Sequence, residues 1–86
     1  MLLTMTQPFS VLEQQFFQKA LTASDAILVT QQALHLALIE NVYGVPGYAR
    51  AADLENIGGV CHPSWTQVSE AQWLQLTCDH DKVVTW

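Results

Sequence analysis

The chain has 86 residues, half of them hydrophobic, which is enough for one folded domain with a core and excludes an intrinsically disordered chain. Its only basic residues are Lys19, Arg50 and Lys82, against eight carboxylates, and the net charge is −5. Nucleic acids and anionic membrane surfaces are bound by clusters of cations, so this composition argues against both partners.

The first predicted element is an amphipathic helix over Ser10–Leu21. Ser10 and Glu13 form the S-x-x-E pattern of a capping box, in which each side chain satisfies a backbone N–H of the first turn. Apolar residues then recur at helical spacing on one side: Leu12, Phe16 and Ala20, with Phe17 and Leu21 beside them. Residues 1–7 precede this helix and are expected to be flexible.

The second predicted element is a long helix over Asp25–Tyr43, ended by Gly44. Its apolar residues fall on every side of the helical wheel, a pattern typical of a helix that is buried all round. So short a chain has little material with which to cover it, so we expect a second copy of the chain, or another protein, to do so. The alternative is that the remaining elements suffice.

A type II turn is predicted at Val45–Tyr48, because Pro46 and Gly47 suit its two central positions. A short helix over Ala49–Ile57 is expected to follow and to end at Gly58. A segment expected to be a loop then leads to Ser69, which begins a second capping box.

The last predicted helix runs from Glu70 to about Thr77, with Gln72 completing the S-x-x-Q pattern. The tail Lys82–Trp86 has the composition of a strand. An alternative pairs Trp73–Thr77 with Val83–Trp86 as a hairpin, since short apolar runs do not distinguish the two. The expected fold is thus mostly α: a single-domain bundle of about four helices over residues 1–86, with a short C-terminal strand or hairpin.

Two cysteines and two histidines near the C-terminus form the sharpest candidate site: Cys61, His62, Cys78 and His80. These are zinc-ligand types, and a zinc ion could stabilise a small fold. The spacing lacks a Cys-x₂₋₄-Cys pair, however, and adjacent Cys61 and His62 cannot easily face one ion. A second alternative is a minor enzyme or small-ligand binder with Cys61 and His62 in a pocket, although neighbours in sequence rarely have the geometry of a nucleophile and its base.

The favoured function is a non-enzymatic protein-interaction or regulatory module, a homodimer or the partner of another protein. We assign no catalytic residue, cofactor or metal. Large apolar and aromatic residues are enriched at interaction hot spots and supply the interface candidates. These candidates are Phe17, Leu34, Leu38, Tyr48, Trp65 and Trp86. No targeting signal or membrane-length apolar stretch is evident, so a cytoplasmic location is expected.

Overall fold

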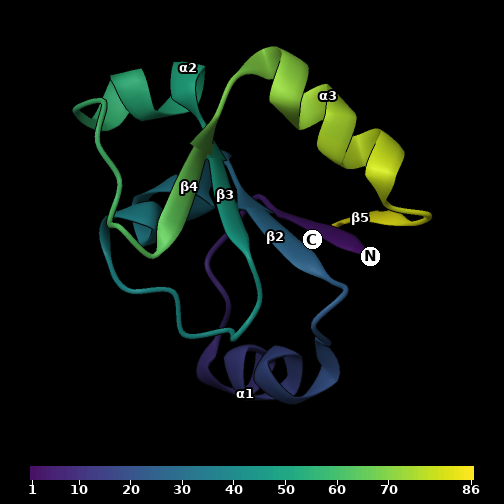
Figure 1. The fold of residues 1–86 in the computed structure, drawn as a ribbon. Helices are drawn as coiled ribbons and strands as arrows, with labels where there is room; N and C mark the ends of the chain where they lie inside the picture. Colours follow the sequence, from purple (N-terminus) through teal and green to yellow (C-terminus); the bar gives the residue numbers. More distant parts are fainter.

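The computed structural model describes residues 1–86 and has an α/β fold built on a five-stranded parallel sheet (Figure 1). The strands are β1 (Leu2–Met5), β2 (Ala26–Val29), β3 (Gly47–Arg50), β4 (Trp65–Val68) and β5 (Val83–Thr85). The helices are α1 (Val11–Ala20), α2 (Ala51–Leu54) and α3 (Glu70–Asp79), with 3-10 segments η1 (Gln31–Leu38) and η2 (Glu55–Ile57). The strand order is β4-β3-β2-β1-β5. The predicted all-helical bundle is therefore wrong.

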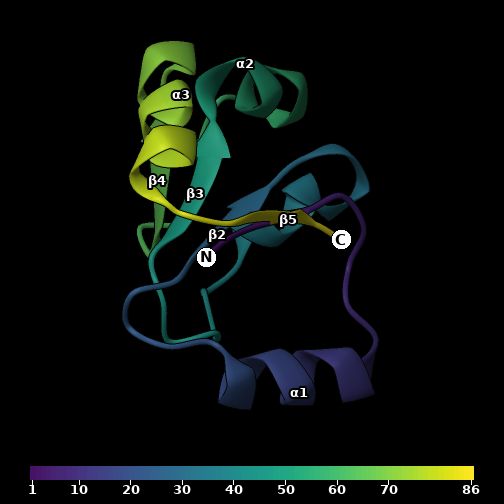
Figure 2. The same ribbon diagram turned by 90° about the vertical axis from the view of Figure 1, so that its right-hand side faces the viewer.

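Helical segments cover the two faces of the sheet unequally, and Figure 2 shows α2 and α3 on opposite sides of it. On one face, Phe17 of α1, Leu34 of η1 and Leu54 of α2 join a cluster of 14 buried residues. On the other face, four buried residues form a smaller cluster against Trp73 and Leu76 of α3. Because no residue of α3 is itself buried, the second face is thinly covered.

The helix predicted over Asp25–Tyr43 does not exist. Its first part, Ala26–Val29, is strand β2, and all four residues are buried. A strand inside a parallel sheet is covered on both faces, so it forms a continuous apolar run with no alternation. Such a run cannot be told from a buried helix by periodicity alone, which is the reason for the error. The remainder is the 3-10 segment η1 and an irregular stretch that leads to β3.

The first residues, expected to be flexible, contain strand β1, which lies between β2 and β5. Leu2, Leu3 and Met5 have no exposed surface. The α-amino group of Met1 donates a hydrogen bond to Oδ1 of Asp25 at 2.8 Å, which ties the start of β1 to the start of β2. The N-terminal segment is therefore part of the core.

Both predicted capping boxes are confirmed, at Ser10 with Glu13 and at Ser69 with Gln72. Each begins a ten-residue α-helix, so residues 70–79 form a helix, and the alternative hairpin is wrong. The tail is a strand as its composition predicts, but β5 pairs in parallel with β1. None of the helices is long and apolar enough to cross a membrane.

Between α1 and α3, the sequence predicted a turn at Val45–Tyr48 and a helix over Ala49–Ile57, and the structure has only part of the predicted helix. Gly47 is the first residue of β3 and does not have a positive φ, so the expected type II turn is absent. The helix predicted over Ala49–Ile57 starts later, because its first residues belong to β3. It then consists of α2 and η2 and ends at Gly58, whose φ of 109° is left-handed.

Candidate protein-interaction surface

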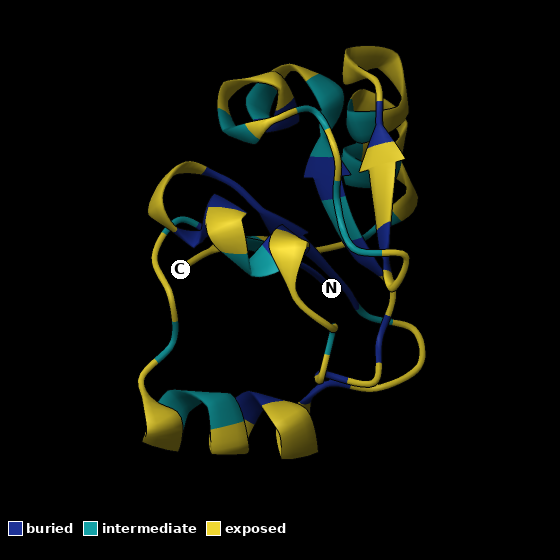
Figure 3. Ribbon diagram, turned by 90° about the vertical axis from the view of Figure 1, so that its left-hand side faces the viewer, coloured by how far each residue is buried: buried dark blue, intermediate teal, exposed yellow.

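The end of η1 and the stretch that follows it expose large apolar side chains. Leu38, Ile39 and Val42 are 48%, 57% and 48% exposed, and they form what we call the apolar loop surface. Figure 3 shows the contrast between the buried inner strands of the sheet and the exposed segments around it. Single exposed apolar residues are normal on proteins, whereas several within one short segment suggest an interaction site.

The backbone of this loop is held in place by the segment that leads into β4. The indole Nε1 of Trp65 donates to the carbonyl oxygen of Ile39 at 2.8 Å. The backbone N–H of Asn41 donates to Oγ of Ser64 at 2.8 Å. Trp65 is a buried residue of the larger core cluster, so its hydrogen bond connects the exposed loop directly to the core.

Further hydrogen bonds act within the loop and toward α1. The side chain of Asn41 donates to the carbonyl oxygen of Val45 at 2.8 Å and accepts from the N–H of Tyr43 at 3.0 Å. The amide Nε2 of Gln18 donates to the carbonyl oxygen of Val42 at 3.1 Å. Side-chain hydrogen bonds thus hold the backbone of this loop in place, as backbone hydrogen bonds between strands hold a strand in a sheet. The apolar side chains of the loop are therefore presented in a defined arrangement.

A hollow of about 140 Å³ lies beside these residues. Its lining consists of Gln14, Leu36, Ile39, Glu40, Val42, Tyr43 and Trp65. Burial raises the pKa of Tyr43 above its ordinary value, so its phenol is neutral at physiological pH. Glu40 is then the only charged group in this lining, and the hollow suits an apolar side chain better than a charged ligand.

A second candidate site lies at the carboxyl ends of β3 and β4. In open α/β sheets, ligands bind where neighbouring strands send their connections to opposite faces. β3 leads to α2 on one face and β4 leads to α3 on the other, which places this switch at Arg50. A hollow of about 170 Å³ there is lined by Arg50, Ala52, Asp53 and Glu70.

Two of the three charged groups of that second site, Arg50 and Asp53, are paired with each other. Arg50 donates from Nε to Oδ2 of Asp53 at 2.8 Å and from Nη2 to Oδ1 at 3.2 Å. Thr30, at the end of β2, donates to the same carboxylate at 3.0 Å. The guanidinium also lies 4.9 Å from the ring centroid of Trp73. This cluster therefore links three connections of the sheet, and the charges of Arg50 and Asp53 neutralise each other within it.

The proposed cysteine and histidine site is not assembled. No group of three or more His, Cys, Asp or Glu side chains lies close enough to hold a metal ion. His62 is hydrogen-bonded to Ser64 in the loop before β4, whereas His80 is bonded to the carbonyl oxygen of Leu76 at the end of α3. Both cysteines are free thiols, and Cys61 donates weakly to the carbonyl oxygen of Trp65.

The six interface residues proposed from the sequence are dispersed. Phe17, Leu34 and Trp65 are enclosed in the larger core cluster, and Leu38 belongs to the apolar loop surface. Tyr48 lies on the opposite face of the sheet, beside α3. Trp86 is half exposed, packs 5.1 Å from the ring of Phe17 and donates to Oε2 of Glu13.

Ile39 and Val42 were missed because they were counted as part of a buried helix. The signal that could have found them is Asn41, since its side chain accepts from the N–H two residues on, as in an Asx-turn. Such a residue before Gly44 indicates a turn and not a continuing helix. The sequence matches no protein-family model and no curated protein.

Proposed function

We propose that this chain is a non-enzymatic protein-interaction module that self-associates through the apolar loop surface. The observation that carries the proposal is the side-chain hydrogen bonding that holds Ile39 and Val42 exposed on a fixed backbone. A surface that is already ordered loses little conformational entropy on binding, so more of the gain from apolar contact remains as affinity.

A second copy is the occupant that the charges of this surface favour. In a two-fold dimer the same patch lies on both sides of the interface, so a patch whose charges all have one sign brings like charges together. The lining of the adjacent hollow contains one formal charge, Glu40, and otherwise apolar, amide and neutral phenol groups. Gln14 and Gln18 of α1 border the patch and supply uncharged hydrogen-bonding groups for the rim.

The contacts of the charged and thiol groups support a non-enzymatic function. Arg50 and Asp53 neutralise each other at the carboxyl ends of the strands, where a catalytic site in this kind of fold would be sought. Cys61 and Cys78 belong to segments on opposite faces of the sheet, next to the larger core cluster and in α3 respectively. Neither cysteine has an adjacent base held by an orienting group, which a catalytic nucleophile requires.

Sedimentation velocity of the full chain over a concentration series tests the proposal. We expect a reversible monomer–dimer equilibrium, and we expect Ile39→Asp to weaken it at least about tenfold, the effect of about 1.4 kcal/mol of lost association energy. The matched control is Leu74→Asp, because Leu74 is similarly exposed but lies on α3 at the other face. Circular dichroism checks that both variants remain folded.

The proposal is overturned if the wild-type chain stays monomeric up to about 200 μM, a concentration at which even a weak specific dimer forms. It is equally overturned if Leu74→Asp weakens the dimer as much as Ile39→Asp, because the interface would then involve α3. A dimer that responds only to Ile39→Asp supports it.

A further inference from the structure

β4 forms one of the two edges of the sheet. β4 is the last strand in the order and pairs only with β3. Natural edge strands are usually protected from pairing by Lys, Pro, a bulge or an inward-pointing charge. β4 has the sequence Trp-Thr-Gln-Val, without Lys, Pro or a charged residue, and Thr66 and Gln67 are exposed.

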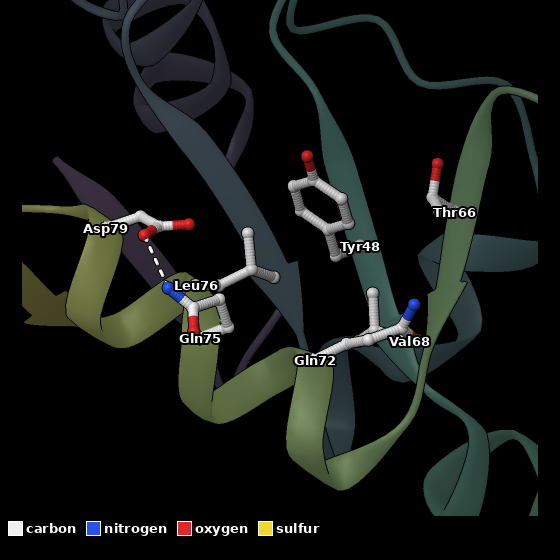
Figure 4. Close-up of a pocket in the computed structure, with 7 residues that line it drawn as sticks. All are labelled: Tyr48, Thr66, Val68, Gln72, Gln75, Leu76 and Asp79. Atoms are coloured by element: carbon white, nitrogen blue, oxygen red, sulfur yellow. Dashed lines mark hydrogen bonds between the residues drawn. The ribbon is translucent and has the colours of Figure 1, made fainter.

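A hollow of about 230 Å³ lies next to this edge, between the thinly covered face of the sheet and α3 (Figure 4). Its sheet side is formed by Tyr48, Thr66 and Val68, and its helix side by Gln72, Gln75, Leu76 and Asp79. Parallel sheets normally have both faces covered, so an open hollow over one of them is unusual. It marks the part of this face that α3 leaves uncovered.

The lining of the hollow is complementary to a long cationic side chain. Val68 and Leu76 provide apolar surface, the ring of Tyr48 can face a cation, and Asp79 provides a carboxylate. Asp79 accepts one hydrogen bond, from Nε2 of Gln75 to its Oδ1 at 2.8 Å, which orients the carboxylate. No cation lines the hollow.

These two features are adjacent because Thr66 and Val68 belong both to the open edge and to the lining. A strand added beside β4 directs every second side chain to this face of the sheet. We propose that β4 binds an extended segment of another protein, and that a Lys or Arg of that segment occupies the hollow with its charge at Asp79. This surface is separate from the apolar loop surface, so the inference does not depend on the proposed self-association.

The test uses a short synthetic peptide of alternating threonine and lysine, acetylated and amidated at its ends, and amide NMR spectra of the full chain. We expect the backbone amides of Thr66, Gln67 and Val68 to shift and to gain protection from hydrogen exchange. Asp79→Asn should weaken binding at least about fivefold, the effect of losing one charge-assisted contact of about 1 kcal/mol. The matched control is Asp81→Asn, which changes the net charge equally but lies outside the hollow.

Equal weakening by Asp79→Asn and Asp81→Asn overturns the proposal, because the peptide would then respond to net charge alone. Shifts that map away from β4 also overturn it. So do β4 shifts that depend on protein concentration without peptide, since a second copy would then occupy the edge. Ile39→Asp should leave peptide binding unchanged, so failure here and failure of the proposed self-association are distinguishable.

Discussion

Gly47 lies directly against the indole ring of Trp65, its partner across the β3–β4 pair. A Cβ added at Gly47 would be 2.5 Å from Cε3 and 2.6 Å from Cζ3 of that ring, and 2.7 Å from Nδ2 of Asn41. The absence of a side chain at Gly47 is thus what allows Trp65 and Asn41, which hold the apolar loop surface, to approach the sheet.

The first prediction concerns this contact. Gly47→Ala should lower the free energy of unfolding by about 2 kcal/mol, because the ring must shift within a packed core. Chemical denaturation measures the loss. Gly44→Ala is the contrast, since a Cβ there meets open space and the cost comes only from the positive φ of 70°. That cost should be about 1 kcal/mol, and an equal or larger loss at Gly44 would contradict the steric explanation.

The second prediction separates the hydrogen bond of Trp65 from its bulk. Trp65→Phe keeps an aromatic ring but leaves the carbonyl oxygen of Ile39 without its donor. We expect a loss of about 1–2 kcal/mol in the free energy of unfolding and, if the proposed dimer forms, weaker self-association. Trp73→Phe is the control, because Trp73 lies on the other face, in the smaller cluster. It should leave self-association unchanged in the same sedimentation measurement.

The third prediction concerns pH and the ion pair at the start of β2. The hydrogen bond from the α-amino group of Met1, followed by the N–H of Thr22, lowers the pKa of Asp25 below its ordinary value. A lowered folded-state pKa means that the carboxylate stabilises the fold above the unfolded value of about 3.9. This contribution is lost progressively as pH falls from there through the folded-state pKa.

The measurement is the free energy of unfolding of wild type and Asp25→Asn between neutral and acid pH. At pH 7 the variant should be less stable by about 1 kcal/mol, and the difference should shrink as pH falls below about 4. Asp81→Asn, at an exposed carboxylate, is the control and should follow the wild-type curve. A difference that stays constant into acid would show that Asp25 acts through packing and not through charge.

The fourth prediction concerns α3, which has no buried residue and so depends strongly on its cap. Ser69→Ala removes the acceptor for the N–H of Gln72 and should cost about 1 kcal/mol. Because little tertiary packing holds this helix, hydrogen exchange should accelerate in residues 70–79 more than in the strands. Ser69→Asp preserves a capping acceptor and should restore most of the protection. Uniform acceleration throughout the chain would mean that α3 unfolds only with the whole domain.

The capping boxes show what can be predicted from local sequence. The Ser10–Glu13 and Ser69–Gln72 pairs are three residues apart, so their hydrogen bonds form within one turn whatever surrounds them. Both helices were accordingly predicted. The prediction of a strand in the tail was also correct, and the left-handed Gly58 ends its helical segment as expected.

The candidate site could be predicted less well. Leu38 was proposed as an interface residue and is exposed on the apolar loop surface, but Ile39 and Val42 were predicted to lie in a helix that a second copy or a partner covers on every side. Their exposure depends on hydrogen bonds from Trp65 and Gln18, which are distant in sequence. The hollow at Asp79 likewise needs β3, β4 and α3 to meet.

By itself, the sequence determined the size of the domain, its scarcity of cations and the start of α1 and α3, because these follow from composition and from contacts within one helical turn. Only the tertiary structure decided that the apolar runs at Leu2–Met5 and Ala26–Val29 are strands. Leu2 pairs with Ala26 on one side and with Val83 on the other. A strand is stabilised by such distant neighbours, and a short, mostly apolar run contains no local signal that identifies the strands with which it pairs.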